Sequence, residues 1–263
     1  MPTNFHQNLK KRFVLGQKKS SMDNILWLIS ARAGSKSILN KNIKVLCGYP
    51  LLAYRIKTAL AISRPCDVWV STDSQEYADI AKSYGAVIPF LRPDILSTDN
   101  ASSVDVVLHA MIHAEKLGRK YDAIGLLEPT SPFITSKQLS ESLNELFNAK
   151  DAENIVAVRS VRPHTYFVQE KSKYLNTLAN KFNLSSKLRR QDRIDEITPS
   201  GGFYVSKWNS FLENRTFYTE KTLQFQVSDI HGIEIDEPVD WLWAEFFLEK
   251  SIITHNQIFD ENI

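Results

Sequence analysis

Short apolar runs alternate along the chain with longer segments in which apolar residues recur at helical spacing. Residues 25–29 are continuously apolar, as expected of a strand that is buried on both faces of a sheet. The pattern predicts strands at 25–29, 67–71, 87–90, 123–127, 155–161 and 201–205, and helices at 51–62, 75–84, 102–117, 136–148 and 239–250. This alternation predicts an α/β fold in which helices cover both faces of a mostly parallel sheet. Ligands of such folds bind at the carboxyl ends of the strands.

Two stretches depart from the alternation. Residues 1–22 contain five lysines and arginines and no acidic residue, and they lack the apolar core of a secretory signal. We expect a flexible basic tail there, with Met22 as an alternative start because it directly precedes the first strand. Residues 162–199 are polar and rich in Lys and Arg, so we expect them to form an insertion in a folded domain that spans 23–263.

Composition narrows the class of protein. The chain has 263 residues, 43% of them hydrophobic and 24% charged, as in a folded domain of ordinary size. Its net charge of +2 gives no reason to expect general affinity for nucleic acid, and no apolar run approaches the roughly 18 residues of a membrane span. Cys47 and Cys66 form no CxxC pair, which favours a reducing, cytoplasmic location over a disulfide framework or a cysteine zinc site.

The loop after the first predicted strand carries the most concentrated candidate chemistry. It consists of Ala31-Arg32-Ala33-Gly34-Ser35-Lys36, with Lys41-Asn42 shortly after. Glycine lets backbone N–H groups approach phosphate oxygens, and the serine, arginine and lysine side chains can all donate to polyphosphate. Neither a Walker P-loop nor GxGxxG occurs, which disfavours ordinary P-loop NTPases and dinucleotide-binding proteins. Taken alone, the loop is equally consistent with a solvated basic turn.

Two further clusters lie near predicted strand ends. Arg92 precedes segment 97–103, which is rich in hydroxyl groups. These residues could also be explained without a ligand, if Asp99 or Ser102 caps the next helix. Glu128 and Thr130 follow a predicted strand among two prolines. The prolines fix the backbone so that both side chains point into the cleft, although an ordinary proline turn has the same composition.

A pair of acidic residues lies near the end of the chain. Glu234 and Asp236 alternate with isoleucines in a segment with a strand pattern, so we expect them on one face of a strand. Magnesium prefers one or two carboxylates together with substrate phosphate oxygens, so this pair suits a nucleotide enzyme.

The order and spacing of these clusters resemble the CMP-sialic acid synthetase family, the acylneuraminate cytidylyltransferases, which includes enzymes that activate Kdo, legionaminic acid and pseudaminic acid. The resemblance runs from about Ile25 to Glu249. Besides the first loop, its motifs are Val70-Ser71-Thr72-Asp73-Ser74, Leu91-Arg92-Pro93, Thr98-Asp99-Asn100-Ala101-Ser102-Ser103 and Pro129-Thr130-Ser131-Pro132. The resemblance implies a Rossmann-like fold of the nucleotidyltransferase (GT-A-like) type.

The resemblance also implies a reaction and its site residues. The family joins CMP from CTP to the anomeric hydroxyl of a 2-keto-3-deoxy sugar acid, so CTP, an acidic sugar and Mg²⁺ are the expected ligands. The positions that match its CTP site are Arg32, Gly34, Ser35, Lys36, Lys41, Asn42, Arg92 and Ser103. Those assigned to the sugar pocket are Glu128, Thr130, Arg190, Gln191, Tyr204, Phe217 and Tyr218. Arg32, Lys36 and Asp236 would be catalytic, and Glu234 and Asp236 would hold the metal.

The resemblance implies a homodimer as well, because residues 162–199 occupy the place of the segment through which the family dimerises. The chain departs from the family at three places. Glu128 replaces the usual Gln, Glu234 replaces Asp, and Thr198-Pro199-Ser200-Gly201 replaces Arg-Pro-Asn-Gly. A second carboxylate repels an acidic sugar by ~1 kcal/mol or more unless a donor or cation intervenes, so we expect a sugar other than ordinary sialic acid.

Two alternatives stay open. One is a nucleotidyltransferase of the same fold that acts on another sugar or nucleotide. The other is a non-catalytic, nucleotide-binding homologue, which the departures at Glu128 and Ser200 allow.

Overall fold

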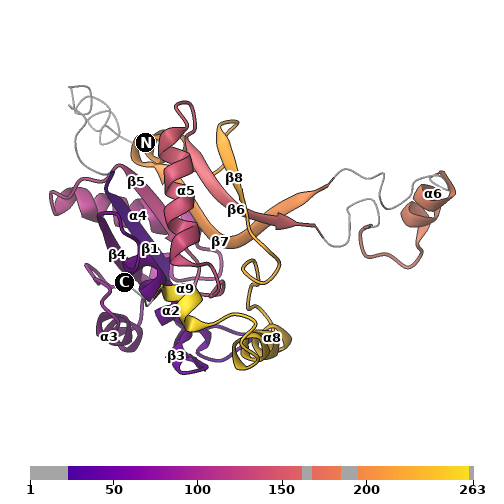
Figure 1. The fold of residues 1–263 in the computed structure, drawn as a ribbon, viewed down its shortest axis with the longest axis horizontal. Coiled ribbons are helices and arrows are strands. Elements are labelled where there is room, and N and C mark those ends of the chain that lie inside the picture. Colours follow the sequence, from indigo (N-terminus) through magenta and orange to yellow (C-terminus); the bar gives the residue numbers. More distant parts are fainter. Residues whose placement is uncertain (1–22, 162–167, 185–194, 261–263) are drawn as a thin grey trace.

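A computed structural model describes residues 23–161, 168–184 and 195–260, and a six-stranded sheet forms its centre (Figure 1). The strands are β1 (Ile25–Ser30), β4 (Cys66–Ser71), β5 (Ala123–Leu127), β6 (Asn154–Ser160), β7 (Ile197–Lys207) and β8 (Thr222–Gln226). Their order is β4-β1-β5-β7-β6-β8. Only β7 is antiparallel to its neighbours among these described strands, since β1 pairs in parallel with β4 and β5, and β6 with β8. The predicted mostly parallel sheet is therefore confirmed.

Helices cover both faces of the sheet, because successive side chains of a strand point to opposite sides. The helices of the first face are α2 (Leu51–Leu60), α3 (Gln75–Ser83) and α5 (Ser136–Asn148), and those of the second are α4 (Ser103–Lys116) and α7 (Trp208–Asn214). Within β1, Ile25, Trp27 and Ile29 belong to the first core, whereas Leu26 and Leu28 belong to the second. All five side chains are fully buried, as the apolar run predicted.

A third, smaller apolar cluster joins the C-terminal helices to the segment after the first loop. Its elements are β2 (Val45–Leu46), β3 (Tyr49–Pro50), the start of α2, α8 (Pro238–Glu249) and α9 (His255–Phe259), and the short helix η1 (Lys41–Ile43) precedes β2. Ile235 and Trp241 are buried in this cluster, so the segment before α8 is held beside the first loop. No helix in the described ranges is both long and apolar enough to cross a membrane.

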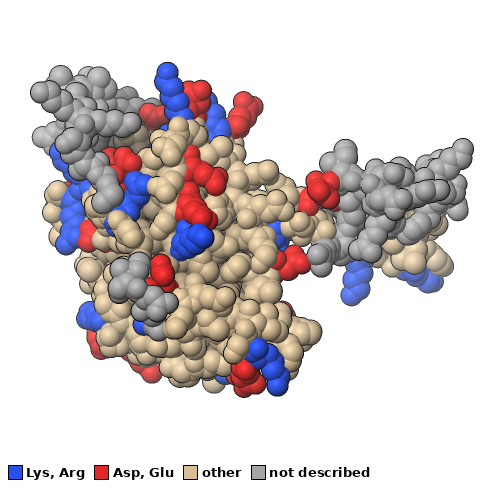
Figure 2. Space-filling view, in the orientation of Figure 1, with Lys and Arg blue, Asp and Glu red and all other residues tan. Residues whose placement is uncertain are grey.

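Residues 168–184 stand away from the body as an arm that carries α6 (Asn176–Leu184), as Figures 1 and 2 show. The arm falls inside the insertion predicted at 162–199, although β7 already begins at Ile197. The predicted basic tail, Met22, Arg190 and Gln191 lie outside the described residues.

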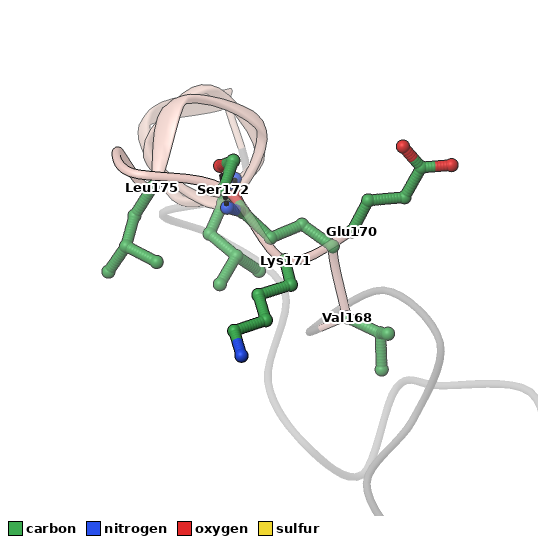
Figure 3. Close-up of a pocket in the computed structure, with 7 residues that line it drawn as sticks. Val168, Glu170, Lys171, Ser172 and Leu175 are labelled. Atoms are coloured by element: carbon green, nitrogen blue, oxygen red, sulfur yellow. Dashed lines mark hydrogen bonds between the residues drawn. The ribbon is translucent and has the colours of Figure 1, made fainter.

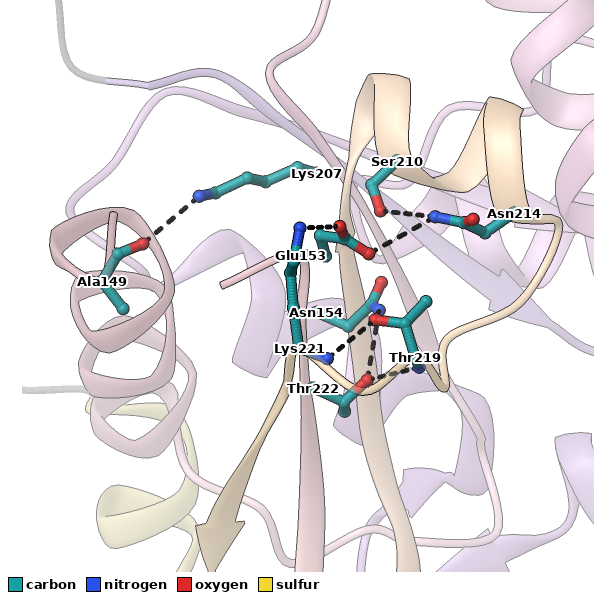
Figure 4. Close-up of polar contacts among 9 residues, drawn as sticks. All are labelled: Ala149, Glu153, Asn154, Lys207, Ser210, Asn214, Thr219, Lys221 and Thr222. Carbon is teal, nitrogen blue, oxygen red and sulfur yellow. Dashed lines mark hydrogen bonds and ion pairs between the residues drawn. The ribbon is translucent and has the colours of Figure 1, made fainter. Parts of the chain in front are cut away.

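A polar network fixes β8 beside the start of β6 (Figure 4). The buried Asn154 donates through Nδ2 to the hydroxyls of Thr219 and Thr222, at 3.1 and 3.2 Å. Next to it, Lys221 forms an ion pair with Glu153 at 3.0 Å. These contacts lie at the amino end of β6, so they support the sheet at the end opposite to the expected ligand site.

Three details of the sequence prediction were wrong. The strand expected at 87–90 is reduced to a single bridge between Trp69 and Val87, because Pro89 has no N–H to continue the pairing. The segment 232–236 forms no strand. The short elements β8, α7 and α9 were not predicted.

Candidate active site

The loop that follows β1 is tied to two neighbouring loops. The Arg32 guanidinium donates to Oδ1 of Asp99 at 2.7 Å, and the Lys36 ammonium donates to Oδ2 of the same carboxylate. These hydrogen bonds, led by that of Lys36, hold the pKa of Asp99 below its usual range. The backbone N–H of Ala33 donates to Asp73 Oδ1 at 2.8 Å, which anchors the loop beyond the end of β4. The two cations predicted to bind CTP and act in catalysis therefore lie together.

Between these cations the backbone is open to a ligand. Gly34 has a φ of +78°, which favours glycine, and no atom lies within 4 Å of the place where a Cβ would stand. Ser35 beside it is half-buried, and Ser103, the first residue of α4, is exposed. Ser102 caps this helix through its side chain, as predicted, whereas Asp99 pairs with the cations of the first loop.

Lys41 and Asn42 connect the first loop to the acidic segment before α8. Lys41 is only 9% exposed, and its ammonium donates to the Ile235 carbonyl at 2.7 Å and to Asp236 Oδ1 at 3.3 Å. Asn42 donates to the Arg32 carbonyl at 3.0 Å. The predicted CTP-binding and metal-binding residues are thus brought to one place at the carboxyl end of β1.

The predicted metal ligands lie close together although no strand holds them. Glu234 is half-buried, and burial together with the charge of Asp236 raises the pKa of Glu234, while Arg159 opposes that rise. The Glu234 carboxylate packs on Gly201 of β7, where a Cβ would come within 2.4 Å of its Oε1. Two carboxylates that repel each other beside a cationic loop provide the oxygen ligands that a hard cation prefers.

Glu128 lies at the centre of this charge distribution. It follows β5 directly and begins a turn in which the Ser131 N–H donates to its carbonyl at 3.1 Å. Burial is the largest cause that raises the pKa of Glu128, to about 7. Of its charged neighbours, Glu234 and Asp236 act in the same direction, and the cations Arg92 and Lys41 oppose them. Glu128 therefore lies within electrostatic reach of the predicted metal ligands, and its contact with a sugar stays a prediction.

Three aromatic residues predicted in the sugar pocket form one cluster. The Tyr204 ring lies 5.7 Å from Phe217 and 6.3 Å from Tyr218, between ring centroids. Burial raises the pKa of the Tyr204 phenol, and the charges of Tyr218, Glu128 and Glu234 add to that rise. The cluster therefore adjoins the acidic side of the site.

Arg92, predicted to bind CTP, and Thr130, predicted to bind the sugar, both make contacts that hold parts of the fold together. Arg92 is only 4% exposed, and its guanidinium donates to the Ser71 and Ser30 hydroxyls, both at 2.9 Å, which braces the ends of β4 and β1. Burial lowers the pKa of Arg92 to about 10. The Thr130 carbonyl accepts from the N–H of Ile235 at 2.8 Å, which holds the acidic segment against the turn after β5. Direct contact of either residue with a substrate stays a prediction.

The sequence analysis missed the part that two residues play in the site. Asp99 was interpreted as a possible helix cap, and Asp73 was quoted only as part of a motif, whereas both accept hydrogen bonds from the first loop.

An α/β sheet whose strand ends gather a cationic, glycine-containing loop and a pair of carboxylates is typical of nucleotidyltransferases. The chain belongs to the cytidylyltransferase family, whose sequence model matches residues 26–223. It is 30% identical over 232 residues to a CMP-N,N'-diacetyllegionaminic acid synthase of Legionella pneumophila, covering 86% of this chain and 96% of that protein.

A second relative is an N-acylneuraminate cytidylyltransferase of Escherichia coli, 32% identical over 226 residues. That alignment covers 86% of this chain but only 52% of the relative, so the chain spans about half its length. The fold is also that of a solved CMP:2-keto-3-deoxy-manno-octonic acid synthetase complexed with CTP, with a TM-score of 0.63, 15% identity and coverage of 86% of this chain and 99% of that one. The expected fold class and family are confirmed.

Proposed function

We propose that this enzyme transfers CMP from CTP to the anomeric hydroxyl of a 2-keto-3-deoxy sugar acid, a sialic acid or related nonulosonic acid, and releases pyrophosphate. The observation that carries the proposal is the meeting of the first loop, with Arg32 and Lys36, and the acidic pair, Glu234 and Asp236, through Lys41 and Asn42. Cations that bind triphosphate and carboxylates that suit a metal are both required for this transfer.

In this reaction the anomeric oxygen attacks the α-phosphorus of CTP, and the bond to the β-phosphate oxygen breaks as pyrophosphate leaves. Arg32 and Lys36 would neutralise the charge that develops on the phosphates, after exchanging their contacts with Asp99 for contacts with CTP. Glu128 and the aromatic residues beside it would orient the sugar. The proton of the anomeric hydroxyl goes to a base that we do not assign.

Magnesium is part of the proposal. Glu234 and Asp236 fit the ion, because both offer carboxylate oxygens and the charge of Asp236 adds to the rise in the pKa of the half-buried Glu234, a repulsion that a cation would relieve. When bound, Mg²⁺ would neutralise phosphate charge and so favour departure of pyrophosphate. Two carboxylates suffice when phosphate oxygens and water complete the coordination.

The test is incubation of the protein with CTP, Mg²⁺ and, separately, N-acetylneuraminic acid, N,N'-diacetyllegionaminic acid and Kdo. We expect pyrophosphate release with at least one sugar and a CMP-sugar of matching mass. Chelation of divalent ions should stop the release, and replacement of CTP by ATP, GTP or UTP should not support it. Absence of turnover with every sugar acid would refute the proposal.

The two alternatives make different predictions in the same assay. A nucleotidyltransferase for another substrate would release pyrophosphate only with a sugar phosphate or another nucleotide. A non-catalytic homologue would bind CTP without turnover. The likeness to a synthase for a diacetylated sugar acid over 96% of that relative favours the first proposal.

We further propose that the enzyme is a homodimer held by its arm. In support, the loop that leads into α6 exposes Tyr174 and Leu175 at 61% and 65%, and the arm stands away from the body (Figure 1). Val168 and Leu175 line a shallow hollow of the arm with polar residues around them (Figure 3). Exposed apolar side chains of this size favour burial against another surface.

Leu175→Asp should turn the dimer into a monomer in sedimentation or light scattering, because a buried charge without a partner opposes association. Lys171→Gln, a polar change on the same arm, serves as the control and should leave the dimer intact. A monomeric unaltered protein, or a Leu175→Asp variant of unchanged mass, would exclude this interface.

A further inference from the structure

Asp236, one of the two proposed metal ligands, is exposed and lies in a segment without regular structure, yet each of its polar groups has a partner. Its carbonyl accepts a hydrogen bond from the hydroxyl of Ser37. Its N–H donates to Asp240 Oδ2 at 3.0 Å. Its carboxylate accepts from the Lys41 ammonium at 3.3 Å, and the same ammonium donates to the neighbouring Ile235 carbonyl at 2.7 Å. Three separate side chains therefore hold Asp236 in place.

These contacts exceed what is needed to anchor the segment. Ile235 is buried in the third apolar cluster, which already fixes the course of the chain. The capping box of α8 requires Asp240 to accept only from the N–H of Glu237, at 2.8 Å, and the bond from the Asp236 N–H is additional. Ser37 is exposed, so water could satisfy its hydroxyl equally well. An account of Ser37 must therefore explain why it is bonded to Asp236.

Residues that bind a metal ligand and fix its orientation are a general feature of metal sites. Their removal typically weakens metal binding 10- to 100-fold, because the ligand then has to be ordered when the ion binds. Bonds to the carbonyl and to the N–H of Asp236 restrict the backbone on both sides of its Cα. They therefore limit the positions that its carboxylate can take.

Two of the three partners of Asp236 belong to the loop that would bind the triphosphate. Ser37 directly follows Lys36, which the proposed function assigns to CTP, and Lys41 lies four residues further on, at the start of η1. Hydrogen bonds join this loop to Asp236 without an intervening residue. A change in the loop on binding a triphosphate is thus passed directly to the metal ligand.

We propose that Ser37 is a positioning residue for Asp236, and that its hydrogen bond couples the two halves of the site. A loop ordered by CTP holds Asp236 ready for Mg²⁺, and Asp236 fixed by the ion holds the loop ready for CTP. Such a coupling is reciprocal, so it can be measured from either ligand. The coupling rests on the function proposed above, whereas the positioning of Asp236 by Ser37 does not.

The positioning role is tested without any ligand, by amide hydrogen exchange of residues 235–237. Ser37→Ala should speed this exchange about three- to tenfold, because the segment opens more often when its carbonyl is released. Ser37→Thr keeps the hydroxyl and should leave the exchange nearly unchanged. The matched control is Ser83→Ala, which removes a hydroxyl bonded to the Ile80 carbonyl within α3. Equal exchange in Ser37→Ala and this control would overturn the positioning role.

The coupling is measured by calorimetry, as the ratio of the CTP dissociation constants in EDTA and in Mg²⁺. Ser37→Ala should lower this ratio about three- to tenfold and change the dissociation constant in EDTA by less than twofold. Ser37→Thr and Ser83→Ala should keep the ratio of the unaltered protein. CTP binding that is weakened by the same factor with and without Mg²⁺ would overturn the coupling, since Ser37 would then act on the nucleotide alone.

Failure of the proposed function has a different outcome. If the unaltered protein binds no CTP, or binds it equally in EDTA and in Mg²⁺, the nucleotide or the metal of that proposal is wrong, and the coupling falls with it. Hydrogen exchange in the ligand-free variants still decides whether Ser37 positions Asp236.

Discussion

Replacing Gly201 tests the metal site, because a larger residue there would disturb two separate things: the backbone conformation of Gly201 and the position of the Glu234 side chain. Its φ of +61° lies in the left-handed region, so Gly201→Ala should cost about 1–2 kcal/mol of unfolding free energy from the backbone alone. The new Cβ would also stand 2.4 Å from Oε1 of Glu234, about 1 Å inside ordinary contact. Glu234 ends in a flexible side chain, so we expect its carboxylate to move while the strand stays in place.

The matched control is Gly118→Ala, since Gly118 has a φ of +68° and open space around the position of a Cβ. Urea unfolding should show a similar loss of stability in both variants. Pyrophosphate release, titrated with Mg²⁺ at saturating CTP and sugar acid, should show a half-saturating Mg²⁺ concentration that is about tenfold higher for Gly201→Ala alone. An unchanged Mg²⁺ requirement in that variant, or an equal shift in Gly118→Ala, would refute the placement of the ion at Glu234.

Three further predictions concern single residues. Asp236→Ala should lower kcat by orders of magnitude at saturating Mg²⁺, with a nearly unchanged Tm because Asp236 is exposed. Glu234→Ala should lower kcat somewhat less. A near-normal kcat of the Asp236 variant would exclude this residue as a metal ligand. The folded protein holds the Glu128 proton up to about pH 7, whereas the unfolded chain releases it near pH 4.5, so stability is lost as the pH rises between these values. Glu128→Gln should remove that loss and be more stable by ~2 kcal/mol near pH 8 but not near pH 5 in urea titrations, and a constant difference would contradict this account. Ser102→Ala should cost about 1 kcal/mol of unfolding free energy through the α4 cap, without changing the KM for CTP, and no loss would argue against the cap.

Much of the fold could be predicted because burial on two faces leaves a strong pattern in the sequence. The run at β1 is apolar at every position since its side chains enter two cores, and the long helices carry apolar residues at helical spacing. The strand β8 has only Leu223 and Phe225 directed to one core, which is too short a signal to separate from a loop. Short elements such as α7 and α9 depend on tertiary contacts that a single sequence does not display.

Segment 232–236 shows why an alternating pattern is not sufficient. Ile233 and Ile235 alternate with Glu234 and Asp236, which predicted a strand, but the isoleucines alternate because they pack into the third cluster beside α8. Strand pairing is absent there, and the Ile235 N–H instead donates to the Thr130 carbonyl. The two acids still act on each other, since the charge of Asp236 helps to raise the pKa of Glu234, and their binding of a metal stays a prediction.

The sequence predicted which types of residue form the candidate site, but not which charged side chains contact each other there. Sequence motifs identified cations and carboxylates that the fold brings to the same strand ends, because parallel strands end at one edge of a sheet. Which charge meets which depends on contacts across the fold: Arg32 and Lys36 share Asp99, from a loop more than sixty positions away. Glu128 looked unfavourable in the sequence because the cations that oppose the rise of its pKa, Arg92 and Lys41, come from loops that only the fold brings near the end of β5.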